Sequence, residues 1–199
     1  MKKKWMGYLG LISLLFLPSP ALYSDIGIKT GLSLSFPGQS NILFSPSRLD
    51  GLNAGIFYAF HIGEYFSIQP GFNYVKKGNK YYCTVCEGTR IANLNYLEIP
   101  IVINVHLLNK TFDLFSGVYV GILLDAVKKE AIHSWTGRDI SIKKTDYGVS
   151  LGARYRFFEF LFVELQFNQG LIAVIEENNQ AVIKGHKNKT LSFLIGFGF

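Results

Sequence analysis

Apolar residues recur at every second position in eight separate segments of this 199-residue chain. In the first segment Ile26 and Ile28 fall on one face, and Gly27 and Lys29 fall on the other. This alternation is typical of a β-strand, whose successive side chains point to opposite sides. The segments cover residues 26–36, 52–60, 66–74, 97–106, 113–122, 146–156, 161–168 and 191–199. The sequence therefore predicts an all-β fold of eight strands.

The connections between these segments alternate in length. Short turns are expected at residues 61–65, 108–111 and 157–159, and long polar loops at 37–50, 76–92, 125–145 and 174–189. Short turns at one end and long loops at the other are typical of outer-membrane barrels. We therefore predict an eight-stranded antiparallel up-and-down transmembrane β-barrel over residues 25–199.

A soluble eight-stranded barrel, such as a lipocalin, is the alternative. It would turn its apolar face inward and a charged face outward. In this chain one face of the strands is almost purely Leu, Ile, Val, Phe and Tyr, and the other carries glycines and charged residues. Because hydrocarbon tolerates only an uncharged outer face with closed hydrogen bonding, the pattern favours the membrane barrel.

The first 24 residues have the features of a secretory signal peptide. Three lysines at positions 2–4 precede an apolar stretch from Trp5 to Leu17, and small residues lead to Asp25. The stretch is shorter than the roughly 20 residues that a membrane-spanning helix needs. We predict a signal peptide over residues 1–24, cleaved after Ala21 or Ser24, and hence export to the outer membrane.

Charge and composition argue against nucleic acid as a partner. The whole chain has a formal net charge of +6, but the three lysines of the predicted signal peptide supply half of it. No recognition motif accompanies the remaining charge, so nucleic acid is not an expected partner. We expect a monomeric barrel without a cofactor, surrounded by outer-membrane lipid.

Charged residues on the glycine-rich face should lie inside the barrel. An eight-stranded barrel is just wide enough to be filled by its own side chains, and an isolated buried charge is costly. We therefore predict a paired charge network in the lumen, with a gated narrow pore or proton path as the alternative. Its members are Lys29, Glu98, Arg154, Arg156 and Glu164. Arg154 and Glu164 lie symmetrically about the 157–159 turn, which predicts a cross-strand pair.

Two cysteines form a Cys-Thr-Val-Cys segment in the second long loop. Zinc would need two further ligands, and a redox motif would need a βαβ unit, and neither is visible. In an exported loop the better interpretation is a local disulfide between Cys83 and Cys86.

Catalysis and metal binding have little support. His133 and Ser134 share a predicted loop, but a nucleophile needs a base and an orienting group that are held rigidly. His61, His106 and His186 show no metal-ligand spacing. We predict no enzymatic activity and no metal site.

The four long loops carry thirteen basic against seven acidic residues. Basic side chains at the outer rim attract anionic glycolipid headgroups or acidic glycans. The candidates are Lys76, Lys77, Lys80, Lys128 and Lys129. The simpler interpretation, that these lysines only keep the loops soluble, stays open.

Four segments carry a family resemblance. They are Tyr96–Pro100 (YLEIP), Ser116–Gly121 (SGVYVG), Asp146–Gly152 (DYGVSLG) and Gly196–Phe199 (GFGF). With these the chain resembles, over residues 25–199, the small outer-membrane β-barrel family that includes PorT-like and OmpA-like proteins.

The resemblance implies a structural or surface-interaction role, or alternatively an accessory part of a secretion apparatus or a small gated pore. Three aromatic residues near the C-terminus resemble the signal by which such chains reach the barrel assembly machinery, a further expected partner. They are Phe193, Phe197 and Phe199.

Overall fold

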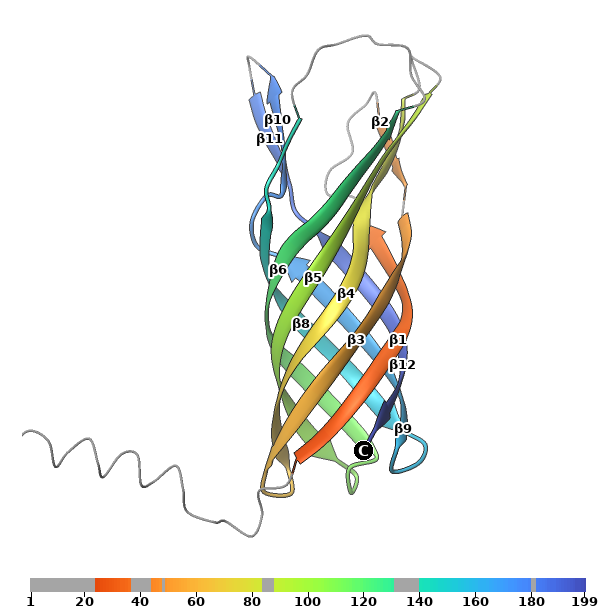
Figure 1. Cartoon of the computed structure of the whole chain (residues 1–199), viewed down its shortest axis with the longest axis vertical. Coiled ribbons are helices and arrows are strands. Elements are labelled where there is room, and N and C mark those ends of the chain that lie inside the picture. The colour runs from red at the N-terminus through yellow and green to blue at the C-terminus, as the bar shows by residue number, and fades with distance from the viewer. Residues whose placement is uncertain (1–23, 37–43, 48, 84–87, 131–139, 180–181) are drawn as a thin grey trace, which may run out of the picture.

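The computed structural model describes residues 24–36, 44–47, 49–83, 88–130, 140–179 and 182–199 (Figure 1). Its barrel strands are β1 (Ser24–Phe36), β3 (Leu49–Ile62), β4 (Phe66–Cys83), β5 (Gly88–Leu107), β6 (Phe112–Glu130), β8 (Thr145–Arg156), β9 (Leu161–Gly170) and β12 (Lys189–Gly198). Four short strands lie beyond one end: β2 (Phe44–Ser47), β7 (Ile140–Ile142), β10 (Ile175–Asn179) and β11 (Val182–His186). Each predicted segment overlaps one barrel strand.

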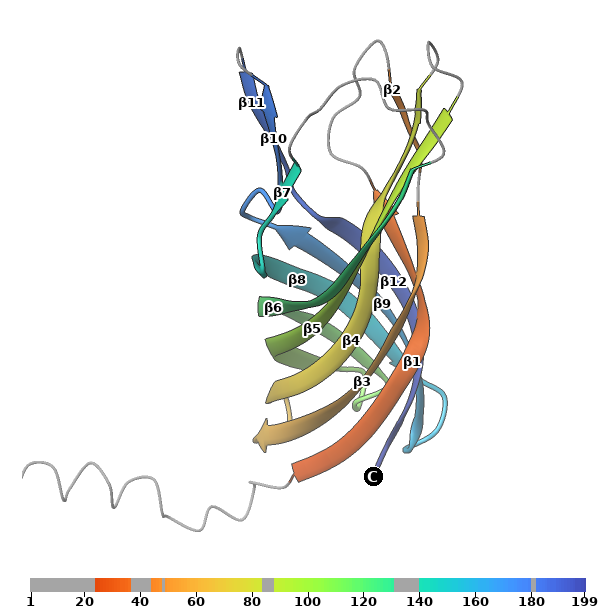
Figure 2. The same ribbon diagram turned by 45° about the horizontal axis from the view of Figure 1, so that its top comes forward.

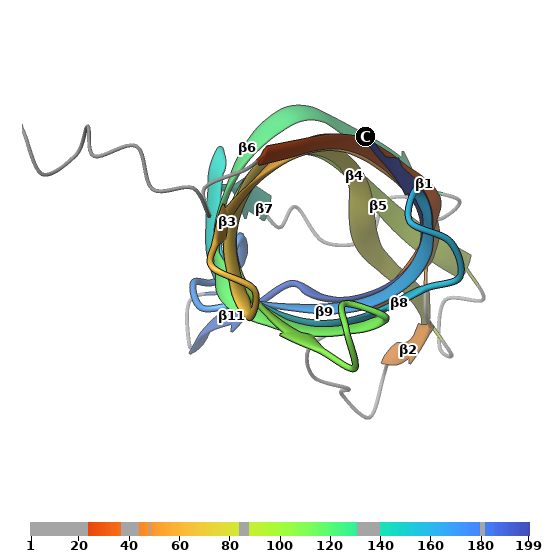
Figure 3. The same ribbon diagram turned by 90° about the horizontal axis from the view of Figure 1, so that it is seen from below.

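The eight long strands close into a ring, as the views in Figures 2 and 3 show. Their order is β4-β3-β1-β12-β9-β8-β6-β5, and a further β4–β5 pairing joins the two ends of this series. Every neighbouring pair is antiparallel, and the first and last strands meet with Gly27 opposite Gly198. Closure leaves no unpaired edge within the barrel wall, as hydrocarbon requires. The predicted eight-stranded antiparallel barrel is confirmed.

Burial alternates along the strands in the sense that a membrane barrel requires. On β9, Val163 and Leu165 are exposed, whereas Phe162, Glu164 and Gln166 are buried. A soluble domain buries its large apolar side chains and exposes its charges. The reverse arrangement here identifies the outer face as the one that contacts lipid. None of the described residues belongs to a helix long and apolar enough to span a membrane.

Three barrel strands are longer than the alternation predicts. We expected loops at residues 76–92 and 125–145, but β4 and β5 stay paired up to Cys83 and Gly88, and β6 runs on to Glu130. Those two loop predictions were wrong. Outside the bilayer a strand no longer needs an apolar outer face, so the hydropathy pattern ends while the backbone ladder continues. We call the parts of β4, β5 and β6 formed by residues 75–83, 88–96 and 123–130 the extension.

Aromatic residues mark where the membrane-embedded part of the wall ends. Phe66 and Tyr74 are exposed at the two ends of the outward column of β4, and Tyr155 and Tyr147 hold the corresponding places on β8. Nine residues from Phe66 to Tyr74 match the 9–11 residues of a tilted transmembrane strand. The remainder of β4 continues beyond this belt for roughly 30 Å along the strand, at about 3.3 Å per residue.

Inward-facing glycines make room for aromatic rings that cross the lumen. A Cβ atom on Gly196 would collide with the ring of Phe162 and lie 2.8 Å from the carbonyl oxygen of Ile28. Gly198, two residues further along the strand, has nothing within 4 Å of such an atom. Phe162 meets Phe57 edge to face, with 5.8 Å between ring centroids. Glycine on one strand therefore allows a large ring on another to fill the barrel.

Candidate functional site

An ion cluster centred on Arg154 fills the lower half of the lumen. Arg154 and Glu164 are cross-strand neighbours, and the Arg154 Nη2 lies 2.6 Å from the Glu164 Oε2. Lys29 donates to the other oxygen of Glu164 at 2.7 Å, and Arg154 also donates to Gln69 at 3.0 Å. The guanidinium lies 4.5 Å from the ring centroid of Phe162, a cation–π contact. Three of the five predicted network residues therefore meet here.

A second cluster, centred on Lys77, lies in the lumen near the base of the extension. The Lys77 ammonium pairs with Glu98 of β5 and, at 3.1 Å, with Asp146 of β8. The hydroxyl of Tyr119 donates to the same oxygen of Asp146 at 3.2 Å. The Lys77 ammonium also lies 4.5 Å from the ring centroid of Tyr119 and 5.4 Å from that of Tyr96. Lys77, Glu98 and Asp146 are fully buried.

The position of Lys77 corrects a prediction. We expected it at the outer rim beside Lys76, but β4 continues without a break, and residue 77 follows Asn73 and Val75 on the inward face. Asp146 was missing from the predicted network. The alternation with Gly148 already placed Asp146 on the inward face. Its partner Lys77 could not be predicted, because we expected Lys77 in a loop outside the lumen.

A third cluster lies at the end of the lumen where the short turns are. Asp113 accepts hydrogen bonds from His106 at 2.7 Å and from Arg156 at 2.9 Å. The Nε2 of His106 lies 3.0 Å from the Ser67 hydroxyl oxygen, and its ring stacks on that of His61 with 5.1 Å between centroids. Asp113 was also absent from the predicted network, although alternation placed it on the inward face.

Ser67, His106 and Asp113 have the connectivity of a hydrolase triad. Their surroundings do not suit catalysis, because Ser67 is 1% exposed and lines neither of the two hollows described at this end of the barrel. A nucleophile must reach its substrate, so we interpret the cluster as part of the packed lumen.

The buried charges balance across the three clusters. The cations are the buried Lys29, Lys77 and Arg154 and the half-buried Arg156, and the carboxylates are Glu98, Asp113, Asp146 and Glu164. Each of these eight groups lies within 4 Å of an opposite charge. Within the part of the chain that the structure describes, these eight formal charges sum to zero, and the side chains that carry them pack the lumen.

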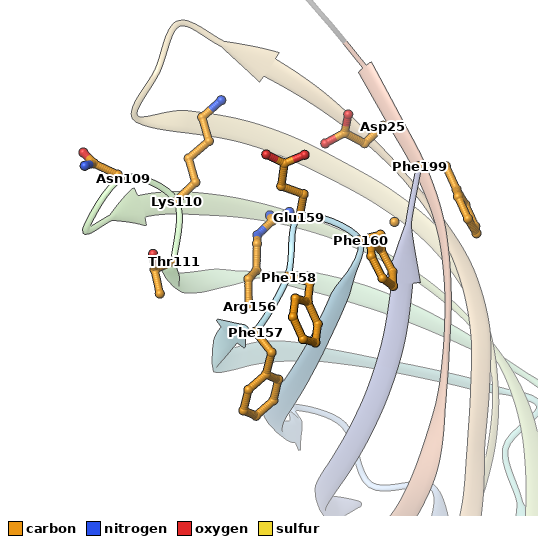
Figure 4. Close-up of a pocket in the computed structure, with 11 residues that line it drawn as sticks. Asp25, Asn109, Lys110, Thr111, Arg156, Phe157, Phe158, Glu159, Phe160 and Phe199 are labelled. Atoms are coloured by element: carbon orange, nitrogen blue, oxygen red, sulfur yellow. The ribbon is translucent and has the colours of Figure 1, made fainter.

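The short-turn end opens into a hollow of about 980 Å³ (Figure 4). In Figure 4 the charged ends of Asp25, Lys110 and Glu159 gather at the opening, whereas the rings of Phe157 and Phe158 point away from it. Both rings are more than half exposed, which suits an aromatic belt at a membrane surface.

Phe197 and Phe199 lie at the same end of the barrel, whereas Phe193 lies about halfway along β12. Phe193 and Phe197 face outward from β12, and Phe199 is 74% exposed directly after it. Their role as an assembly signal remains a prediction that rests on their position in the sequence.

All five basic residues predicted for the outer rim belong to the extension, but Lys77 faces the lumen. Lys76 is half-buried on the outward face of β4. Lys80 and Lys129 are both register partners of Ile91 on β5, from opposite sides, and Lys128 is next to Lys129 on β6. The backbone register thus gathers lysines from two strands around a third, which proximity in the sequence alone does not predict.

Several predicted residues lie outside what the structure describes. Cys83 ends β4 opposite Gly88, but its side chain and the whole of Cys86 are beyond the described part, so their disulfide stays a prediction. The same holds for His133 and Ser134. Among the residues described, no group of three or more His, Cys, Asp or Glu side chains is arranged to hold a metal ion.

Comparison with known proteins decides the family. Residues 18–176 match the family model described as "Outer membrane protein beta-barrel domain". The chain belongs to this family. The resemblance noted in the sequence and the predicted outer-membrane location are thereby confirmed. No protein with a curated description matches the sequence.

Solved structures with the same fold include small outer-membrane barrels. Ail, the attachment invasion locus protein of Yersinia pestis, has a TM-score of 0.51 and 11% identity, over 88% of this chain and 99% of that one. Neisserial surface protein A has a TM-score of 0.51 and 11% identity, over 87% and 97%. Ail in complex with the heparin analogue sucrose octasulfate matches with a TM-score of 0.50 and 10% identity, over 88% and 99%. At these identities the likeness shows the fold alone.

Proposed function

We propose that this protein is a non-enzymatic barrel of a Gram-negative-type outer membrane that carries a basic platform for anionic glycans outside the cell. The observation that carries the proposal is the extension, a three-stranded wall that leaves the membrane belt with Lys76 and Lys80 of β4 and Lys129 of β6 at positions of its outward face. We call these three lysines the platform. Lys128 and Arg90 stand at positions of the opposite face and add to the positive charge of the wall.

The arrangement of charges on the extension supports a polyanionic ligand. Its described acids are Asp125 and Glu130, and Glu130 is the register partner of Arg90. The lysines therefore outnumber the acids that could neutralise them. A patch with an excess of one sign attracts an oppositely charged partner and raises its rate of association. Ail, a barrel with the same fold, has been crystallised with a sulfated sugar, which is consistent with this use of the architecture.

The packed lumen of the barrel supports a role as a rigid base for the extension better than a role as a pore. Arg154 crosses the lumen between β8 and β4, and Lys77 links β4 to β5 and β8. A solute would have to displace both ion clusters, whose members are buried and paired. We expect purified protein in planar bilayers to give no steady conductance. A stable open channel would contradict the closed lumen.

Binding to heparin tests the platform. A Lys76→Gln, Lys80→Gln, Lys129→Gln variant should bind at least tenfold more weakly than the parent at low salt, because each lysine near an anionic surface contributes about 1 kcal/mol. The control is Lys110→Gln at the opposite end of the barrel, which should bind like the parent. Both variants should keep the heat-dependent gel mobility of a folded barrel. Equal binding by the triple variant and the parent would refute the proposal.

A further inference from the structure

Four exposed lysines gather where the small β7-β10-β11 sheet joins the barrel. They are Lys143, Lys144, Lys187 and Lys189. Ile142 of β7 and His186 of β11 are both register partners of Ile175 on the strand between them. Lys143 follows Ile142, and Lys187 follows His186. The backbones of the two lysines therefore flank that of Val174, at the same height along the strands. Two strand spacings separate their backbones by about 10 Å.

The cluster lies directly above the lipid-facing wall. Along β12 the outward column runs through Ile195 and Phe193 to Leu191 and then reaches Lys189, followed by Lys187. The change from apolar to basic on one face of one strand marks the outer boundary of the hydrocarbon. Lysine at such a boundary packs its stem on apolar surface and extends its ammonium group to the headgroup level.

The neighbouring acids leave the cluster positive. Asp146, close to Lys144 in the chain, is buried and paired with Lys77 inside the barrel, so it does not neutralise the outer face. On β10, Glu177 is the register partner of Lys184 on β11. The strands of the small sheet thus hold two acids, Glu176 and Glu177, against Lys184 and the four lysines at the base of the sheet.

We propose that these lysines bind the phosphate groups of a phosphorylated glycolipid in the outer leaflet of the same membrane. The site differs from the platform in place and in partner. It lies on the β8–β12 side of the barrel at headgroup level, whereas the extension rises beyond the membrane on β4, β5 and β6. Phosphate is the matching chemistry because it is the anionic group found at that depth, and lysines whose backbones are about 10 Å apart can extend their side chains to one headgroup.

Binding in lipid nanodiscs tests the proposal. The barrel is placed in phosphatidylcholine nanodiscs, and bis-phosphorylated lipid A is titrated in and bound lipid is counted by native mass spectrometry. Lys187→Gln with Lys189→Gln should weaken retention of lipid A at least tenfold. Lys187→Arg with Lys189→Arg keeps the charge and should retain it. Dephosphorylated lipid A should be retained poorly by all variants.

The outcomes separate this site from the platform. If the glutamine variant loses lipid A but still binds heparin, the two sites are distinct, as we expect. The platform variant Lys76→Gln, Lys80→Gln, Lys129→Gln should show the converse and so serves as the matched control. Equal retention of lipid A by the glutamine variant and the folded parent would overturn the proposal. If inorganic phosphate at the same concentration as the lipid displaces bound lipid A, the site is one for free anions, and this result would also overturn the proposal.

Discussion

Lys77 is the buried cation of its cluster and pairs with two fully buried carboxylates, so its removal should be far more damaging than that of a rim lysine. Lys77→Met keeps the length of the side chain and removes the charge. Glu98 and Asp146 would then lie inside the barrel without their ammonium partner. Breaking a buried pair from one side costs about 3–5 kcal/mol, because an uncompensated charge stays buried. We expect a loss of that size in the free energy of unfolding.

Neutralising the two carboxylates should reverse most of the loss. In the triple variant Lys77→Met, Glu98→Gln, Asp146→Asn no net charge is left in this cluster, and replacing a whole buried ion cluster by neutral groups is often close to neutral in stability. The recovery would show that the loss came from stranded carboxylates and not from a badly packed methionine.

The assay is urea-induced unfolding in lipid vesicles, followed by the mobility of folded and unfolded barrel on unheated gels. Lys76→Met is the matched control, because Lys76 precedes Lys77 but is half-buried on the outward face. Such a surface change should alter stability by no more than about 0.5 kcal/mol. If Lys77→Met and Lys76→Met unfold at the same urea concentration, our account of the lumen is wrong.

Three further predictions address packing, the cysteines and a turn. Gly196→Ala should lower the free energy of unfolding by about 1–3 kcal/mol through overpacking. Gly198→Ala, with nothing within 4 Å of its new Cβ, should leave that free energy nearly unchanged in the same assay. If Cys83 and Cys86 are bonded, the intact mass of protein from oxidising medium should be two hydrogens below that of the reduced form, and full alkylation without reductant would refute the bridge. Lys110 has a φ of 64°, so Lys110→Gly should raise stability by about 1 kcal/mol, and a loss would show that its side chain matters more than the backbone strain.

Residue alternation alone was enough to define the wall of the barrel. Alternation is a property of adjacent residues, and the bilayer requires every outward position in its hydrocarbon layer to be apolar. Ile28 and Leu165 could therefore be assigned to the outer face, and Lys29 and Glu164 to the lumen, without knowledge of the fold. The pair formed by Arg154 and Glu164 was equally predictable, because a short turn sets the register of the two strands that it joins.

Tertiary structure decided where the strands end and which charges meet. Above the membrane nothing in the solvent enforces alternation, so the continuation of β4 past Tyr74 and the inward position of Lys77 depend on pairing with β5. Lys29 and Glu164 are 135 residues apart in the chain, and Lys77 and Asp146 are 69 apart. Strand-to-strand offsets around a closed ring set the height of each side chain in the lumen. A local pattern with a period of two residues carries no information about those offsets.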